Sequence, residues 1–147
     1  MLLFIIFSIA NGPTVLGIDS FTLMQVLSVL FIAILFTQSG FDKLLNWKAN
    51  LEWLKEHFSA TFFKNWVSLL LLILTITEIA SGVLSLVGVV SILIGNGLHI
   101  AYIGVVLSAI SILFLFLGQR IAKDYAGAGS LVPYFILIIG TMFLLYQ

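Results

Sequence analysis

The chain has 147 residues, of which 62% are hydrophobic and 8% are charged, and its six basic and six acidic side chains cancel. Soluble domains carry about 25% charged residues, so this composition excludes a water-facing surface and predicts an integral membrane protein. The lack of a basic excess argues against nucleic acid as a partner. The absence of cysteine excludes disulfides and thiolate metal sites.

The first segment, residues 1–19, is predicted to be interfacial or re-entrant. Its opening apolar run is too short to cross a bilayer, and Asn11-Gly12-Pro13 interrupts it. A signal peptide is disfavoured because no Lys or Arg occurs before Lys43. A fifth, broken helix is the alternative interpretation.

Four later stretches, approximately residues 21–41, 66–88, 98–118 and 131–146, are apolar enough to cross a membrane. A crossing helix needs about 20 such residues, and helices are expected because lipid cannot satisfy exposed backbone groups. The predicted fold is all-α, a single transmembrane domain spanning residues 1–147 and built as a four-helix bundle.

The basic residues fall only in the first and third connections between these helices. Both connections lie on one side of a four-helix bundle, which the positive-inside rule assigns to the cytoplasm, leaving both chain ends outside. If the N-terminal segment crosses the membrane, residue 1 moves inside and nothing else changes. The basic residues are Lys43, Lys48, Lys55, Lys64, Arg120 and Lys123.

The first connection, residues 46–64, has the pattern of an amphipathic helix. Apolar residues recur there at spacings of four, three, four and four, while the charged residues fall mostly on another face. We predict an interfacial helix that braces the bundle, with a gate for lipid or substrate as the alternative. The apolar positions are Trp47, Leu51, Leu54, Phe58 and Phe62.

Glu78 lies within the second predicted transmembrane helix, where a carboxylate costs about 2.5–3.5 kcal/mol. It should therefore face the bundle interior, and Thr75, Gly82 and Ser85 share its face. Two interpretations stay open: a proton-carrying or ligand-binding carboxyl, and a structural hydrogen bond between helices. The expected partners are Gln38, Ser39, Ser108, Ser111 or a group of another subunit.

Two further polar clusters are candidates for binding a ligand or a partner. At the end of the first helix, Gly40 permits close approach, although residue chemistry alone favours a plain helix end with a charge pair at the headgroup level. In the third connection, Arg120 suits an anionic headgroup and Tyr125 an interfacial anchor. The candidates are Gln38, Ser39, Gly40, Asp42, Lys43, Arg120, Lys123 and Tyr125.

The two histidines do not predict a metal or haem site in this chain alone. The topology places His57 on the basic side and His99 near the opposite face, whereas a haem ligated by two histidines needs both at one depth. A single histidine contributed to a partner's site stays open.

Small residues recur along the third helix at steps of three and four. Such a seam lets membrane helices approach closely, and the helix that it meets could belong to this chain or to another. The seam comprises Gly97, Ala101, Gly104, Ser108 and Ser111.

From Leu23 to its end, the chain resembles the DoxX-like membrane proteins of bacteria. The resemblance is carried by the run 39–44, Ser-Gly-Phe-Asp-Lys-Leu, by Glu78 with Gly82, and by the run 119–128, Gln-Arg-Ile-Ala-Lys-Asp-Tyr-Ala-Gly-Ala. Residues 1–20 depart from the family pattern.

The resemblance implies a four-helix bundle of the bacterial inner membrane. Together with the positive-inside rule, this places the C-terminus in the periplasm. The expected partners are membrane lipids and other membrane-protein subunits. The family is named after a subunit of a quinone-linked oxidoreductase, and other members scaffold redox enzymes. The positions implied to matter are Ser39, Gly40, Asp42, Lys43, Glu78, Arg120 and Lys123.

Three functions are compatible with these observations, and the first is favoured because no cofactor motif or extramembrane domain is apparent and small-residue seams are abundant. The first is an accessory subunit that assembles or anchors a larger, redox-linked membrane complex, without a cofactor of its own. The second is a quinone-reactive subunit in which Glu78 handles protons. The third is a small transporter or lipid-binding protein.

Overall fold

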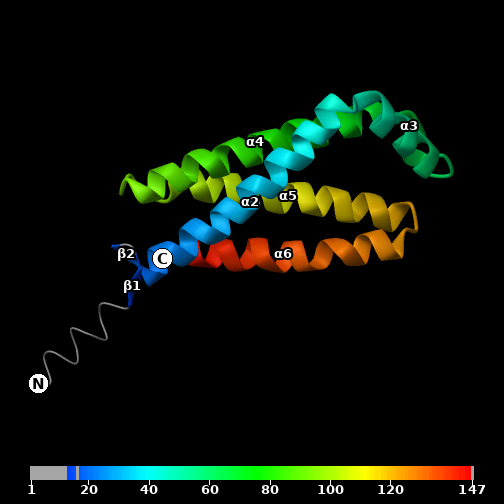
Figure 1. Cartoon of the computed structure of the whole chain (residues 1–147). Helices are drawn as coiled ribbons and strands as arrows, with labels where there is room; N and C mark the ends of the chain where they lie inside the picture. The colour runs from blue at the N-terminus through cyan, green and yellow to red at the C-terminus, as the bar shows by residue number, and fades with distance from the viewer. Residues whose placement is uncertain (1–12, 16, 147) are drawn as a thin grey trace, which may run out of the picture.

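The computed structural model describes residues 13–15 and 17–146, which form a bundle of helices preceded by a short hairpin (Figure 1). Four of the described helices are long and apolar enough to cross a membrane, the pattern of a multi-pass membrane protein. They are α2 (Ser20–Leu45), α4 (Val67–Leu93), α5 (His99–Ile121) and α6 (Tyr125–Leu145). The shorter elements are β1 (Thr14–Val15), β2 (Ile18–Asp19), α3 (Trp47–His57) and the 3-10 helix η1 (Phe62–Asn65).

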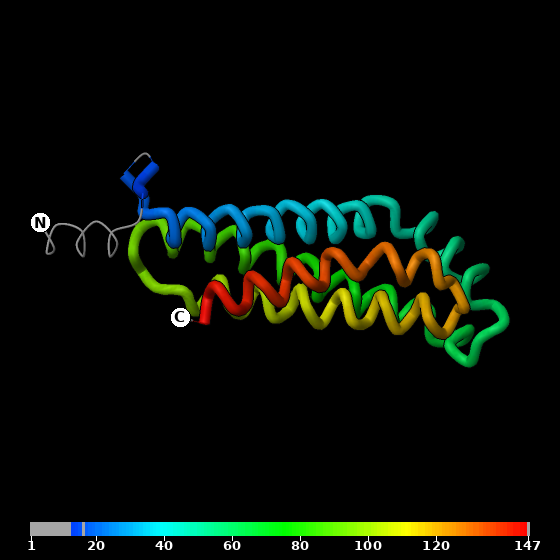
Figure 2. The backbone as a smooth tube through the Cα atoms, turned by 90° about the horizontal axis from the view of Figure 1, so that it is seen from below, coloured from blue at the N-terminus to red at the C-terminus, as the bar shows by residue number. Residues whose placement is uncertain are grey.

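The long helices run alternately up and down, so that the bundle has two distinct ends (Figure 2). The connection containing α3 and η1 and the α5–α6 connection lie at one end, and the six basic residues lie in or beside them. The N-terminus of α2, the α4–α5 connection and the C-terminus of α6 lie at the other end (Figure 1). We call the first the basic end.

Glycines set the closest approaches between the helices. A Cβ on Gly82 would lie 2.6 Å from the backbone nitrogen of Thr37, and one on Gly104 would lie 2.7 Å from that of Ser85. Backbones this close gain van der Waals contact that larger side chains would prevent. These contacts fix α4 against α2 on one side and against α5 on the other.

The helix α2 ends short of its neighbour at the basic end. Gly40 packs on Ile79, and from that level α2 continues only to Leu45, whereas the antiparallel α4 reaches back to Val67. At 1.5 Å per residue, α4 therefore extends about 10 Å beyond the end of α2. The chain crosses this uncovered part of the bundle as α3 and η1.

Capping side chains explain where two of the long helices begin. Asp19 accepts a hydrogen bond from the Thr22 amide at 2.9 Å, and Asp124 accepts one from the Gly127 amide at 2.8 Å. Each bond satisfies an amide that the first helical turn leaves without a partner. The cap at Asp124 starts α6 six residues before the predicted boundary at residue 131.

Two other segments differ from their predicted form. Of the segment predicted to be interfacial or re-entrant, residues 1–12 and 16 lie outside the described residues, and the rest forms an antiparallel hairpin that pairs Thr14 with Asp19. The helix predicted over residues 46–64 is a helix only to His57, because the chain then turns at Phe58–Thr61 before η1.

Candidate functional site

A buried ion pair joins α2 to α4 at the basic end of the bundle. The Lys43 ammonium lies 2.8 Å from Glu78 Oε2, donates a hydrogen bond to Oε1 at 3.1 Å, and donates another to Ser39 Oγ at 2.8 Å. The Glu78 side chain is 0% exposed and that of Lys43 is 16% exposed. The fully buried Glu78 carboxylate requires this pairing, since an unpaired charge would be costly in an apolar interior.

The partner of Glu78 is therefore Lys43, which was not among the expected partners. Ser39 contributes through its bond to the ammonium, Gln38 is exposed, and Ser108 and Ser111 bond elsewhere. Because the predicted helix ends at residue 41, Lys43 falls in the connection that follows it, where a charge at the headgroup level is expected. Its spacing of three and seven residues from the buried Gly40 and Phe36 was the signal that it shares their inward face.

A hydroxyl pair links α4 to α5 one turn from Glu78. Ser81 Oγ and Ser108 Oγ are 2.5 Å apart, and each also lies 3.1 Å from the Gly104 carbonyl oxygen. Since each hydroxyl has one proton, one donates to the carbonyl and the other donates to its hydroxyl partner. Within the described residues, the buried hydroxyls of Thr37 and Ser85 have no hydrogen-bond partner. Both lie against the glycine contacts, where the helices approach too closely to admit another group.

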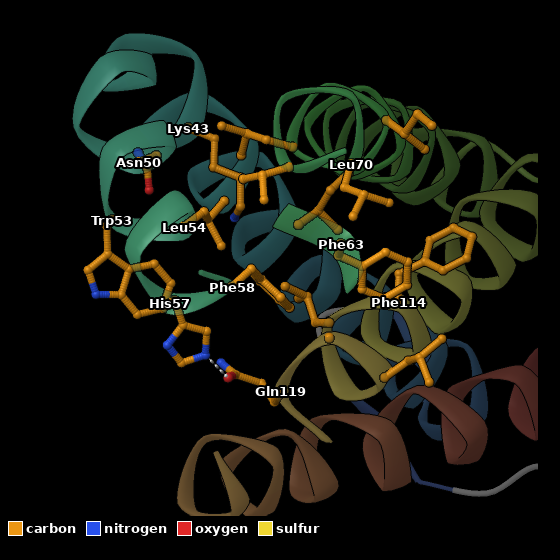
Figure 3. A pocket seen from close by; sticks show the side chains of 17 residues that line it. Lys43, Asn50, Trp53, Leu54, His57, Phe58, Phe63, Leu70, Phe114 and Gln119 are labelled. Carbon is orange, nitrogen blue, oxygen red and sulfur yellow. Dashed lines mark hydrogen bonds between the residues drawn. The ribbon is translucent and has the colours of Figure 1, made fainter. Parts of the chain in front are cut away.

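A cavity of about 480 Å³ lies at the basic end, where α2 has stopped. Its walls come from α3 and η1, from the first turns of α4 and from the last turns of α5, and Lys43 closes one side (Figure 3). Ligand pockets commonly have volumes of about 300–1,000 Å³, with mostly apolar walls and a few polar groups. The lining residues are mainly Leu, Phe and Trp, with Asn50, His57 and Gln119 as the other polar ones.

The outer wall of the cavity belongs to the lipid-facing surface of the bundle. Leu70 and Ile73 of α4 and Phe114 and Leu117 of α5 line the cavity, and each is also an exposed apolar side chain. Phe114 is 50% and Leu117 is 52% exposed. In a membrane, these residues would border the bilayer, so the cavity would open sideways toward lipid.

An aromatic cluster and one hydrogen bond hold α3 over the cavity. The His57 ring stacks on Trp53 with centroids 4.7 Å apart, and its Nε2 lies 3.0 Å from Gln119 Oε1 of α5 (Figure 3). Phe58 is buried against Gly118, where an added Cβ would lie 3.3 Å from the ring. Neither His57 nor Gln119 is predicted from the sequence to be part of such a site.

The other predicted binding residues lie near the cavity mouth or outside it. Asp42 is exposed and accepts a hydrogen bond from Asn46 at 2.8 Å, and the Arg120 guanidinium stacks over the Tyr125 ring at 4.7 Å. Lys123 has a φ of 63° in the turn between α5 and α6 and is exposed. The cavity lining includes none of the four residues Asp42, Arg120, Lys123 and Tyr125.

The predicted seam on α5 packs against α4 through most of its members. Ala101, Gly104, Ser108 and Ser111 are buried. Gly97 instead lies before the helix with a φ of 94° and open space around it, so it serves the turn between α4 and α5. Left-handed φ values of this kind are readily adopted by glycine.

Within the described residues, no group of three His, Cys, Asp or Glu side chains could hold a metal ion. His57 lies at the basic end and His99 begins α5 at the opposite end. Comparisons of the chain with protein-family models, with curated proteins and with solved structures gave no match.

Proposed function

We propose that this membrane protein binds one lipid-like molecule in the cavity beneath α3. The observation that carries the proposal is an apolar cavity of about 480 Å³ whose outer wall is made of lipid-facing side chains and whose inner side ends on a buried ion pair. The apolar chain of such a molecule would contact the apolar walls of the cavity. Its polar head would lie near the polar lining residues His57, Gln119 and Asn50.

Filling this cavity should remove the bound molecule. Gly118 lines the cavity, and Gly118→Leu would place a side chain in it beside Phe58. We expect wild-type protein purified in mild detergent to carry a lipid-like molecule at near-equal stoichiometry, and Gly118→Leu to carry several-fold less. Native mass spectrometry measures both.

Gly140→Leu provides the matched control, since Gly140 lies on α6 with open space around it and does not line the cavity. It should retain the bound molecule. Equal occupancy in Gly118→Leu and wild type, with both proteins folded, would contradict the proposal.

The resemblance to DoxX-like proteins would make this a protein of the bacterial inner membrane and suggests a quinone as one molecule of the proposed kind. The lining residues fit such a ring: Gln119 has an amide that could donate to a carbonyl, and Phe58 and Trp53 offer apolar contact. A bound quinone would supply electron and proton transfer, while this chain's residues would bind and orient it. Glu78 is engaged with Lys43 and does not line the cavity, so we assign it no proton transfer.

A second candidate function is that of an accessory subunit docked through α6. Gly129 and Gly140 are exposed, have open space around them and lie eleven residues apart, close to three helical turns. Membrane helices dock closely over such small residues. A photocrosslinker at Gly140 should then yield a discrete adduct with another membrane protein, whereas one at exposed Ile76 of α4 should not; equal diffuse labelling would argue against docking.

We further propose that the basic end faces the cytoplasm, the C-terminus lies in the periplasm, and α3 lies amphipathically in the membrane interface. The support is the clustering of all six basic residues at this end, together with exposed Trp53 and Trp66 beside them. Cysteine labelling tests the orientation cleanly, because the chain has no native cysteine.

Ser59 at the basic end and Asn96 in the α4–α5 connection are both exposed and serve as the two labelling positions. A membrane-impermeant reagent added to intact cells should label Asn96→Cys and spare Ser59→Cys. The reverse pattern would overturn the orientation.

A further inference from the structure

The ammonium that lines the cavity is paired before any ligand enters. Among the described residues that line it, the ionisable side chains are Lys43 and His57, and the Glu78 carboxylate lies 2.8 Å from the Lys43 ammonium. Lys43 also donates to Glu78 Oε1 and Ser39 Oγ, so two of its three protons are already engaged in close bonds. Lys43 therefore offers no unpaired positive charge to an anion.

Two side-chain amides and one imidazole supply the remaining hydrogen-bonding groups of the cavity wall. Gln119 Oε1 is only an acceptor, so His57 Nε2–H is the donor of their bond. Within the described residues, the Gln119 amide group donates no side-chain hydrogen bond. Asn50 donates to the Asn46 carbonyl at 3.0 Å, and within the described residues its side-chain oxygen accepts no hydrogen bond.

We propose that the cavity selects an uncharged lipid whose head carries hydroxyl or carbonyl groups, and discriminates against anionic lipids. This inference rests on the proposed function. A hydroxyl head could donate to the Asn50 side-chain oxygen and accept from the Gln119 amide group, so these two uncharged amides could satisfy it. An anionic head at Lys43 would lose its hydration in a place where the Glu78 carboxylate opposes it.

Two lipids with the same acyl chain, one with an uncharged head and one with an anionic head, provide the test. A monoacylglycerol with a brominated chain is uncharged, and the corresponding monoacylglycerol phosphate is anionic. Trp53 lines the cavity and reports proximity through bromine quenching once Trp47 and Trp66 are replaced by Phe. Titration in nonionic detergent should give a Kd for the monoacylglycerol about tenfold or more below that for its phosphate.

Gln119→Leu and Gln38→Leu form a matched pair of variants. Gln119 lines the cavity, whereas Gln38 is exposed on α2 and does not. We expect Gln119→Leu to raise the Kd for the monoacylglycerol by about three- to tenfold, the loss expected for one hydrogen bond, and Gln38→Leu to leave it unchanged. Native mass spectrometry of the wild-type chain with the same two lipids supplies a measurement independent of the tryptophan substitutions.

The outcomes separate the inference from the function on which it rests. Equal or tighter binding of the phosphate would overturn the selectivity and leave lipid binding standing. Monoacylglycerol binding that is indifferent to Gln119→Leu would overturn the assigned polar contact and with it the proposed basis of selection. Binding of neither lipid, by quenching or by mass spectrometry, would overturn both proposals.

Discussion

The middle of the bundle and its basic end pack in opposite ways. In the middle, Gly82 and Gly104 bring α4 within direct backbone contact of α2 and α5, and Ser81 and Ser108 bond across the interface. At the basic end, large side chains surround about 480 Å³ of open volume beneath α3. The ion pair of Lys43 and Glu78 lies beside this cavity.

This difference separates architecture from binding. Helices in lipid gain little from apolar burial alone, so close contact between small residues has to hold the bundle together. Protein interiors are otherwise filled almost as densely as organic crystals. An apolar cavity of this size that opens toward lipid is therefore the part of the molecule best suited to take up a ligand.

The largest expected effect on stability comes from breaking the ion pair. Lys43→Met would leave the fully buried Glu78 carboxylate without its partner, at a cost of about 3–5 kcal/mol of unfolding free energy. The double variant Lys43→Met/Glu78→Leu should recover most of this loss, because it removes both charges. Thermal unfolding in detergent measures the effect.

Lys48→Met is the control for this experiment, since Lys48 is exposed on α3. It should unfold like the wild type. If Lys43→Met unfolds like Lys48→Met, the pair does not stabilise the boundary between the two regions.

A smaller loss is expected from a bulky residue in the closely packed middle. A Cβ at Gly104 would lie 2.7 Å from the backbone nitrogen of Ser85, so Gly104→Leu must push α4 and α5 apart. Overpacking of this kind costs about 1–3 kcal/mol. Thermal unfolding should show a clear loss for Gly104→Leu and none for Gly140→Leu, which enters open space; equal stabilities would mean that the middle is not the more tightly packed region.

The smallest effect concerns the cap of α2, outside both regions. Hydrogen bonds from the Thr22 hydroxyl and amide lower the pKa of Asp19 below its ordinary 3.8. Because the folded pKa lies below the unfolded one, the cap stabilises the helix above pH 3.8 and loses this effect as the pH falls through the folded value.

Amide hydrogen exchange in the first turn of α2 measures this contribution. Asp19→Ala should speed exchange at Thr22 relative to wild type at pH 7, and the difference should shrink in acid. Asp19→Ser retains a cap without a titrating group, so its difference from Asp19→Ala should change little with pH. An acid-insensitive difference between wild type and Asp19→Ala would contradict the assigned role.

The sequence predicted the helical bundle because the number and length of apolar stretches follow directly from the thickness of a bilayer. The cavity could not be predicted from the length and composition of the apolar stretches. It depends on where α2 stops relative to α4, and that offset is set by the contact of Gly40 with Ile79 across two helices.

The site was predictable only in part for the same reason. The inward position of Glu78 follows from the cost of a charge in lipid, and its periodicity with Thr75 and Gly82 marks the face. His57 and Gln119 are 62 residues apart and meet only because α3 folds back over the end of α5. No local pattern in the sequence marks that pair.

Photolabelling with an uncharged lipid tests the central claim most directly. A monoacylglycerol with a photoreactive chain would be added to native membranes, and its attachment sites on this protein mapped by peptide mass spectrometry. The account predicts labelling concentrated in residues 53–74 and 114–119, which unlabelled monoacylglycerol suppresses. Labelling spread evenly over all lipid-facing surfaces, including exposed Ile136 and Phe143 of α6, and insensitive to competition would contradict it.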